Sequence, residues 1–79
     1  MTEEEWLKSG DWEKADSSNV AALRYDRQTR RTYVRFKSGD VYHYSPMTEH
    51  LAGQFFSAAS MGKFVWHLRR MGYVGVKVE

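Results

Sequence analysis

The sequence contains no cysteine, a single proline and no long apolar run. Without cysteine the chain has neither a disulfide framework nor a thiolate metal site to help it fold. No apolar segment approaches the roughly 20 residues of a membrane span, and the opening Met-Thr-Glu-Glu-Glu lacks the basic-then-apolar order of a signal peptide. We therefore expect a soluble, cytoplasmic protein that is not attached to a membrane.

The folded state must then depend on an apolar core. A chain of 79 residues makes one small domain, and a domain of this size buries only about 60% of the surface that its unfolded chain exposes. Hydrophobic residues make up 42% of the sequence, and twelve of them are aromatic, which gives a large buried area per position.

Charge is distributed unevenly along the chain. Residues 1–16 contain six acidic and two basic side chains, a net charge of −4, whereas residues 17–79 contain ten basic and four acidic side chains, a net charge of +6. This division predicts an acidic N-terminal arm (1–16) and a basic domain (17–79). A basic domain is typical of proteins with a polyanionic partner, although the same charge also serves solubility alone.

The arm has features of a structured segment. Thr2 and Glu5 have the spacing of a capping box, which predicts one helical turn from Glu3 to Lys8. Trp6 and Trp12 are unusual in a disordered tail. We expect the two indoles either to pack back on the domain or to anchor a protein partner, since tryptophan is enriched at interface hot spots.

Beyond the arm, period-two alternation predicts short strands at 20–26, 32–37 and 41–45, joined by turns at 26–30 and 37–40. Two helices should follow. For the first, Ser45 is the expected N-cap and Pro46 the first helical residue; for the second, Ser60 is the expected N-cap and Gly72 the C-terminal cap. The expected apolar stripes are Met47, Leu51, Phe55 and Ala58 in the first helix, and Met61, Phe64, Val65, Leu68 and Met71 in the second.

A last strand is predicted at 73–79, with Val74, Val76 and Val78 on one face. The fold class is therefore α+β: a three-stranded antiparallel meander, two short helices and a C-terminal edge strand, in the order β-β-β-α-α-β. An exposed edge strand leaves pairing with a second copy open, so we expect a monomer or a weak dimer.

Alternation also divides the predicted sheet into two faces. The expected core face carries Ala21, Leu23, Tyr25, Thr32, Val34, Phe36, Tyr42 and Tyr44. The opposite face and the first hairpin carry the candidate nucleic-acid contacts Arg24, Arg27, Arg30, Arg31, Tyr33, Arg35, Lys37 and His43. Guanidinium groups bind phosphates and flat rings stack on unpaired bases, which favours single-stranded nucleic acid as the ligand.

The second predicted helix carries a similar combination. Lys63, Trp66, His67 and Arg70 follow each other at i, i+3, i+4 and i+7, on the side away from Phe64 and Leu68. A tryptophan among exposed basic residues suits nucleic acid; alternatively, Trp66 belongs to a wide core and the bases are ordinary helix surface.

Motifs for catalysis and metal binding are incomplete. Ser60-Met61-Gly62-Lys63 matches S-x-x-K, but the accompanying S-D-N and K-T-G elements are absent. The three histidines lack metal-binding spacing and have no cysteine partners. We therefore expect a non-enzymatic domain without cofactor or metal.

Five blocks of sequence carry a resemblance to a known family: Ser17-Ser18-Asn19-Val20, Tyr25-Asp26, Phe36-Lys37-Ser38-Gly39, Val41-Tyr42-His43-Tyr44, and Ser60-Met61-Gly62-Lys63-Phe64 with Leu68-Arg69. In this order they resemble the KTSC domain, found at the C-terminus of some lysyl-tRNA synthetases and as small stand-alone proteins of bacteria and phages. The resemblance begins near Ser17 and does not cover the arm. It implies RNA binding, a suggestion that comes from attachment to a tRNA-charging enzyme.

Two functions are consistent with these features. The first is a small module that binds RNA or another single-stranded nucleic acid through the basic sheet face and the basic stripe of the second helix. The second is an adaptor or inhibitor that binds a host protein, encoded by a phage or mobile element, with Trp6, Trp12 and Trp66 as contacts. In a third arrangement the acidic arm folds over the basic domain and competes with a polyanion.

Overall fold

The computed structural model describes residues 2–10 and 12–78. The predicted β-β-β-α-α-β order is confirmed, and a helix and a short strand precede it. In chain order the elements are α1 (Glu3–Ser9), β1 (Glu13–Lys14), β2 (Val20–Asp26), β3 (Arg31–Phe36), β4 (Val41–Tyr44), α2 (Glu49–Phe56), α3 (Met61–Arg70) and β5 (Val76–Lys77).

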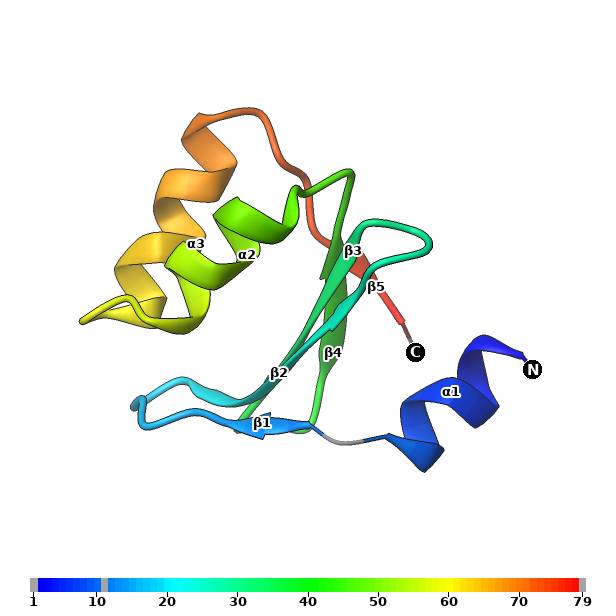
Figure 1. The fold of residues 1–79 in the computed structure, drawn as a ribbon. Coiled ribbons are helices and arrows are strands. Elements are labelled where there is room, and N and C mark those ends of the chain that lie inside the picture. The colour runs from blue at the N-terminus through cyan, green and yellow to red at the C-terminus, as the bar shows by residue number, and fades with distance from the viewer. Residues whose placement is uncertain (1, 11, 79) are drawn as a thin grey trace.

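The strands form one antiparallel sheet in the order β1-β2-β3-β4-β5. Helices α2 and α3 cover one face of this sheet, and α1 lies on the other side (Figure 1). Both edge strands, β1 and β5, are only two residues long. No helix in the described part of the chain has the length and apolar character needed to cross a lipid bilayer.

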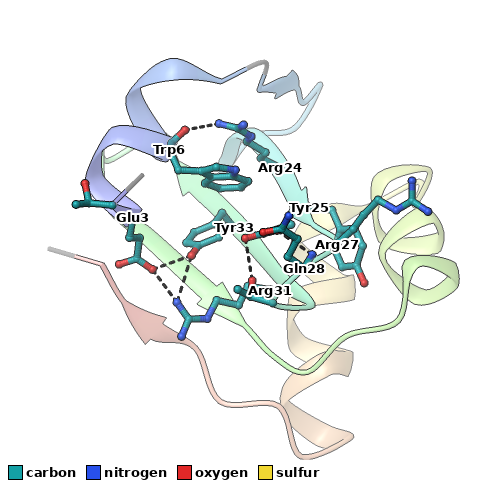
Figure 2. A pocket seen from close by; sticks show the side chains of 11 residues that line it. Glu3, Trp6, Arg24, Tyr25, Arg27, Gln28, Arg31 and Tyr33 are labelled. Atoms are coloured by element: carbon teal, nitrogen blue, oxygen red, sulfur yellow. Dashed lines mark hydrogen bonds and ion pairs between the residues drawn. The ribbon is translucent and has the colours of Figure 1, made fainter.

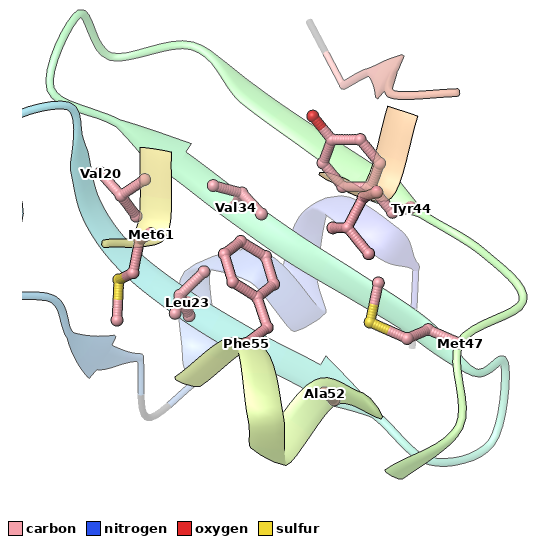
Figure 3. Close-up of a cluster of buried hydrophobic side chains, with 9 residues drawn as sticks. Val20, Leu23, Val34, Tyr44, Met47, Ala52, Phe55 and Met61 are labelled. Atoms are coloured by element: carbon pink, nitrogen blue, oxygen red, sulfur yellow. The ribbon is translucent and has the colours of Figure 1, made fainter. Parts of the chain in front are cut away.

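The hydrophobic core lies between the sheet and the α2–α3 layer. Phe55 of α2 is fully buried and points toward Leu23 and Val34 of the sheet (Figure 3). The rings of Phe55 and Phe64 stack at 5.1 Å and join the two helices. Complete burial of a phenylalanine contributes about 1.5–3 kcal/mol, so this contact is a major source of the stability of the domain.

The predicted core face is confirmed at most positions. Leu23, Thr32, Val34 and Tyr44 are buried, and Tyr25, Phe36 and Tyr42 pack at the margin of the core. At the start of β2 the register shifts between Val20 and Ala22, so Val20 rather than Ala21 fills the core. A bulge of this kind interrupts the period of two, which a simple alternation rule cannot anticipate.

The predicted start of the first helix is wrong. Ser45-Pro46 forms a cis peptide bond, and α2 begins at Glu49 with Thr48 as its N-cap, whose Oγ1 accepts from the Leu51 amide at 3.1 Å. Met47 lies before the helix because its side chain is fully buried and its amide donates to the Arg30 carbonyl at 2.8 Å. Thr48 is therefore the first residue free to cap the helix.

The second helix agrees with its prediction at both ends. Ser60 Oγ accepts from the Lys63 amide at 3.4 Å. Gly72 has φ +103° and follows the C-cap Met71, and the Tyr73 amide donates back to the Leu68 carbonyl at 3.0 Å. Met71 was expected on the apolar face, but its side chain is 56% exposed, because the chain turns away from the core at the end of the helix.

The last strand is shorter than predicted and does not face the core. Val76 and Lys77 form the ladder pairs with β4, and the Val78 amide donates to the Val41 carbonyl at 2.7 Å. The side chains of Val74 and Val76 are 76% and 51% exposed. The approach to the strand is fixed at Gly75, where an added Cβ would lie 3.0 Å from the Tyr44 hydroxyl. The strand therefore runs along the edge of the sheet beyond the cover of the helices.

Candidate nucleic-acid interface

The sheet face opposite the helices is covered, contrary to the expectation of an exposed surface. Arg24, Tyr33 and His43 lie directly across from one another on β2, β3 and β4. The Tyr33 side chain is 2% exposed and that of His43 is 9% exposed. Trp6 of the arm packs on Arg24 and Tyr33, so the centre of the surface that was expected to contact bases is buried beneath the protein's own N-terminal residues.

Trp6 of α1 is the centre of this cover (Figure 2). Its ring lies 4.9 Å from the ring of Tyr33, and the Arg24 guanidinium carbon lies 3.6 Å from the centre of the indole on the other side. An Arg24 Nη1–H also donates to the Trp6 carbonyl. The indole therefore lies between a guanidinium over its ring and a phenol tilted at 45° to it, and these contacts fix α1 to the sheet.

Trp12 makes a second contact of the same kind. The Arg35 guanidinium carbon lies 4.3 Å from the centre of its indole, and the indole N–H donates to the Leu7 carbonyl at 3.0 Å. Of the two interpretations of the arm tryptophans, packing on the domain is the one seen in this structure. Partner binding by Trp6 and Trp12 stays a prediction and would require the arm to move.

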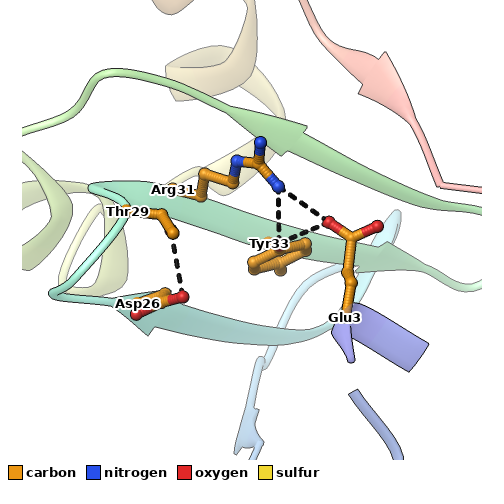
Figure 4. A network of polar contacts seen from close by, with 5 residues as sticks. All are labelled: Glu3, Asp26, Thr29, Arg31 and Tyr33. Atoms are coloured by element: carbon orange, nitrogen blue, oxygen red, sulfur yellow. Dashed lines mark hydrogen bonds and ion pairs between the residues drawn. The ribbon is translucent and has the colours of Figure 1, made fainter. Parts of the chain in front are cut away.

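Glu3 completes the arm contacts (Figure 4). Its Oε2 accepts from the Tyr33 hydroxyl at 2.7 Å and pairs with Arg31 Nη1 at 2.9 Å. Burial raises the pKa of the Tyr33 phenol, with the Glu3 carboxylate acting in the same direction and the Arg31 guanidinium opposing it. Burial also lowers the pKa of His43, assisted by the Arg31 charge and opposed by Glu3.

The remaining cations of the predicted sheet interface lie at the hairpin and the strand end. Arg27, Arg30 and Lys37 are exposed. Arg27 pairs with Glu49 at 3.0 Å, and Arg30 has a left-handed backbone, φ +57°, in the turn between β2 and β3. A cleft of about 590 Å³ separates this hairpin from α1 and is lined by Glu3, Trp6, Arg24, Arg27 and Arg31, among others. The sequence pattern grouped the sheet face with the hairpin arginines, but it did not indicate that Glu3 and Trp6 of the arm line a cleft with them.

The outer face of α3 is open, in contrast to the sheet face. Lys63, Trp66, His67 and Arg70 are all exposed, and the Trp66 side chain keeps 55% of its surface. The Arg70 guanidinium carbon lies 4.9 Å from the centre of the indole, and the His67 ring meets its edge at 5.7 Å. Trp66 therefore does not belong to a wide core, and among the described residues no carboxylate pairs with Lys63, His67 or Arg70.

The beginning of α3 adjoins a loop that is distant in sequence. A cleft of about 480 Å³ is lined by Asp16–Asn19 on one side and by Ala59–Lys63 with Trp66 on the other. A Cβ at Gly62 would lie 3.5 Å from Asn19 Nδ2, so the two segments are in near contact. Nothing in the spacing of these segments along the chain predicts that they meet, since it is the packing of the α2–α3 layer on the sheet that brings them together.

A further groove runs between the sheet and the end of α3. It has a volume of about 570 Å³ and is lined by Phe36, Tyr42, Tyr44, Val65, Arg69, Tyr73, Val74 and Gly75. Burial raises the pKa of the Tyr44 phenol, and the Arg69 charge opposes that shift. Tyr42 and Tyr44 thus line a solvent-accessible groove although both belong to the core face.

Two comparisons with known proteins concern the family and the fold of the chain. The sequence profile of the KTSC domain matches residues 16–73. The chain belongs to the KTSC family. The fold is also that of a KTSC domain protein from Yersinia pestis, whose crystal structure superposes with a TM-score of 0.77 at 23% sequence identity and covers 87% of this chain and 97% of the other. No curated protein matches the chain.

The KTSC match contains both parts of the candidate interface, because Arg24, Tyr33 and His43 of the sheet face as well as the α3 face lie within residues 16–73. Its limits include the α3 face, both segments of the cleft at the start of α3 and the tyrosines of the groove. Helix α1, which packs on the other sheet face, and the edge strand β1 precede the first matched residue. Among the described residues of this KTSC chain, no three histidine, aspartate or glutamate side chains are arranged to hold a metal ion.

Proposed function

We propose that this KTSC domain is a non-enzymatic module that binds single-stranded nucleic acid, with RNA as the first candidate, through the outer face of α3. The observation that carries the proposal is the half-exposed Trp66 indole in line with Lys63, His67 and Arg70. An exposed large aromatic side chain is costly in water, and its position between cations is suited to a base stacked on the indole with phosphates on either side.

The charge of α3 supports the same proposal. The helix contains Lys63, Arg69 and Arg70 and no acidic residue. Because no carboxylate among the described residues neutralises these three cations, they are available to phosphates. The loop at Ser17–Asn19 extends the surface beyond the N-terminus of the helix. We expect the domain to act in the cytoplasm as a monomer or weak dimer.

The experiment is a fluorescence anisotropy titration of labelled single-stranded RNA with the full chain at two salt concentrations. We expect saturable binding that Trp66→Ala weakens by about tenfold or more, since a stacked base contributes about 1–3 kcal/mol. Met71→Ala is the matched control, because Met71 is equally exposed at the end of the same helix. Duplex DNA and tRNA in parallel titrations define the preferred class.

The cationic contribution has its own test. The slope of log affinity against log salt is negative. Lys63→Gln combined with Arg70→Gln should make it less steep, by about 0.7 for each phosphate that the domain no longer neutralises. Lys77→Gln is the control, because Lys77 lies on β5 and pairs with Asp40. Binding that is unchanged in both the tryptophan and the double variant would exclude the α3 face as the site.

The alternative is a protein-binding adaptor, which the exposed apolar residues near the end of α3 suggest. Trp66, Met71, Val74 and Val76 are each more than half exposed. If no nucleic acid binds at low salt, these residues become the positions to substitute in a search for a host protein, and disappearance of a captured partner on nuclease treatment would favour nucleic acid again.

A further inference from the structure

The arm binds its own domain through the same kinds of interaction that a single-stranded nucleic acid makes. Two flat indoles lie against guanidinium groups, Trp6 on Arg24 and Trp12 on Arg35. One carboxylate, that of Glu3, accepts from the Tyr33 hydroxyl and pairs with Arg31. Bases stacked on arginine and aromatic side chains, with phosphates on arginine, would use the same groups of the sheet.

The arm is an addition to the family domain. Residues before Asp16 precede the KTSC match, and the backbone of the described arm pairs with the sheet through the two residues of β1 and through the Ala15 amide, which donates to the Ala21 carbonyl at 3.0 Å. It carries a net charge of −4 against +6 for the rest of the chain. An acidic segment linked to a basic surface has a high effective concentration there, so it competes strongly with any free ligand for the same groups.

We propose that the sheet face formed by Arg24, Arg31, Tyr33, Arg35 and His43 is a second surface for single-stranded nucleic acid, and that the arm is an intramolecular competitor which leaves this face before the strand binds. The proposal rests on the proposed function for the class of ligand. It differs in place, because α3 and this face lie on opposite sides of the sheet (Figure 1).

The buried groups of this face fit the proposal. Arg24, Tyr33 and His43 form a row across three strands, with neighbouring strands about 4.8 Å apart. Trp6 already contacts two of these three side chains, the Arg24 guanidinium and the Tyr33 ring. His43 Nδ1 is buried without a hydrogen-bond partner among the described residues, a costly unpaired group that a bound nucleotide would satisfy.

Gly10 offers a way to open the arm without substituting a residue of the face. An added Cβ at Gly10 would lie 1.3 Å from Arg24 Nη1, so Gly10→Ala forces the guanidinium off the Trp6 indole. The backbone there has φ −103°, which alanine adopts without strain. Gly53→Ala is the matched control, because a Cβ at Gly53 meets nothing within 4 Å.

Two measurements on the full chain decide the question. Hydrogen exchange at the Trp12 indole N–H reports whether the arm is docked, because that group donates to the Leu7 carbonyl only while α1 is folded. Anisotropy of labelled oligouridine reports binding. We expect Gly10→Ala to accelerate the exchange and to raise affinity by about tenfold, if the docked arm covers the face about nine-tenths of the time.

Arg35→Gln in the Gly10→Ala background should remove that gain. If Gly10→Ala leaves the arm docked, the Trp6→Ala, Trp12→Ala double variant replaces it with the same expectation. An opened arm with unchanged or weaker oligouridine affinity would refute the proposal. A dimer in which two copies exchange their arms, with no gain in affinity for oligouridine, would also refute the proposal.

The two proposals fail separately. If the α3 variants weaken binding and opening the arm changes nothing, the α3 interface stands and the second surface is excluded. In the opposite case the α3 variants have no effect, binding appears only when the arm opens, and Arg35→Gln abolishes it. The sheet face is then the site and the α3 interface is excluded.

Discussion

The stack of Arg24 on Trp6 allows a direct test of what holds the arm in place. Trp6→Ala removes the indole, and Arg24→Met removes the guanidinium while keeping an unbranched chain of similar length. Arg24 also donates to the Trp6 carbonyl, but that carbonyl remains when Trp6 becomes alanine. In a double-mutant cycle its effect is therefore common to both backgrounds, and the coupling energy reports the guanidinium–indole contact alone.

The geometry gives the expected magnitude. A guanidinium over an indole contributes about 0.5–1 kcal/mol when exposed and about 2 kcal/mol when desolvated. Arg24 is half-buried and its guanidinium carbon lies 3.6 Å from the ring centre, so we expect a coupling of about 1 kcal/mol. Trp6→Ala alone should cost about 1–3 kcal/mol, because it also removes the ring that packs 4.9 Å from Tyr33.

These energies have an upper bound. If the arm leaves the sheet while the rest of the domain stays folded, as we propose, no arm variant can cost more than the free energy of docking. Phe55→Ala is the contrasting control, since Phe55 is fully buried in the core and its removal should cost about 3–5 kcal/mol. Adding Trp12→Ala to Trp6→Ala should therefore cost less than the sum of the two single variants.

The assay is urea unfolding followed by far-ultraviolet circular dichroism, because tryptophan fluorescence changes with the substitution itself. Urea is uncharged and leaves the ionic contacts of the arm unscreened. A destabilisation of about 1 kcal/mol shifts the midpoint by about 0.5–1 M in a domain of this size. A coupling energy no larger than about 0.3 kcal/mol, the ordinary scatter of independent sites, would refute the assignment of docking energy to this stack.

Two further predictions concern the helix cap and the buried histidine. Ser60→Ala should lower the free energy of unfolding by about 1 kcal/mol, because Ser60 Oγ caps α3, whereas Ser60→Gly should cost only a few tenths; equal effects in thermal unfolding would argue against capping. The pKa of His43 is lowered from its ordinary value of 6.5, so the unfolded chain binds the proton more readily, and stability present above that value should decline as pH falls below it. His43→Gln should reduce this decline, and an identical pH profile in the variant would contradict it.

Sequence patterns were a good guide where local chemistry acts alone. The capping residues of α1 and α3 are confirmed, since a side-chain oxygen binding an amide three residues on depends only on neighbours in the chain. The alternation at Leu23, Thr32, Val34 and Tyr44 is confirmed as well. By contrast, the N-cap of α2 is Thr48 rather than Ser45, because Met47 has first to reach the core.

For the candidate interface the sequence placed residues on faces but could not say which faces stay open. It put Tyr33 and His43 opposite the core, as the structure does, yet both are buried, since Trp6 of α1 packs on Tyr33 and the Tyr33 ring packs on His43. For Trp66 the sequence left open whether the indole belongs to a wide core or to the helix surface, and the structure leaves it exposed. Exposure depends on what packs against a residue from elsewhere in the chain, which a local pattern does not contain.

The α+β class, the KTSC blocks and the division between an acidic arm and a basic domain could be read without the fold, because each follows from spacing or composition along the chain. The position of the arm could not. Trp6 contacts Arg24 and Tyr33 across eighteen and twenty-seven positions of sequence. Such contacts form only after the sheet has brought β2 and β3 together and offered the indole a flat, cationic surface.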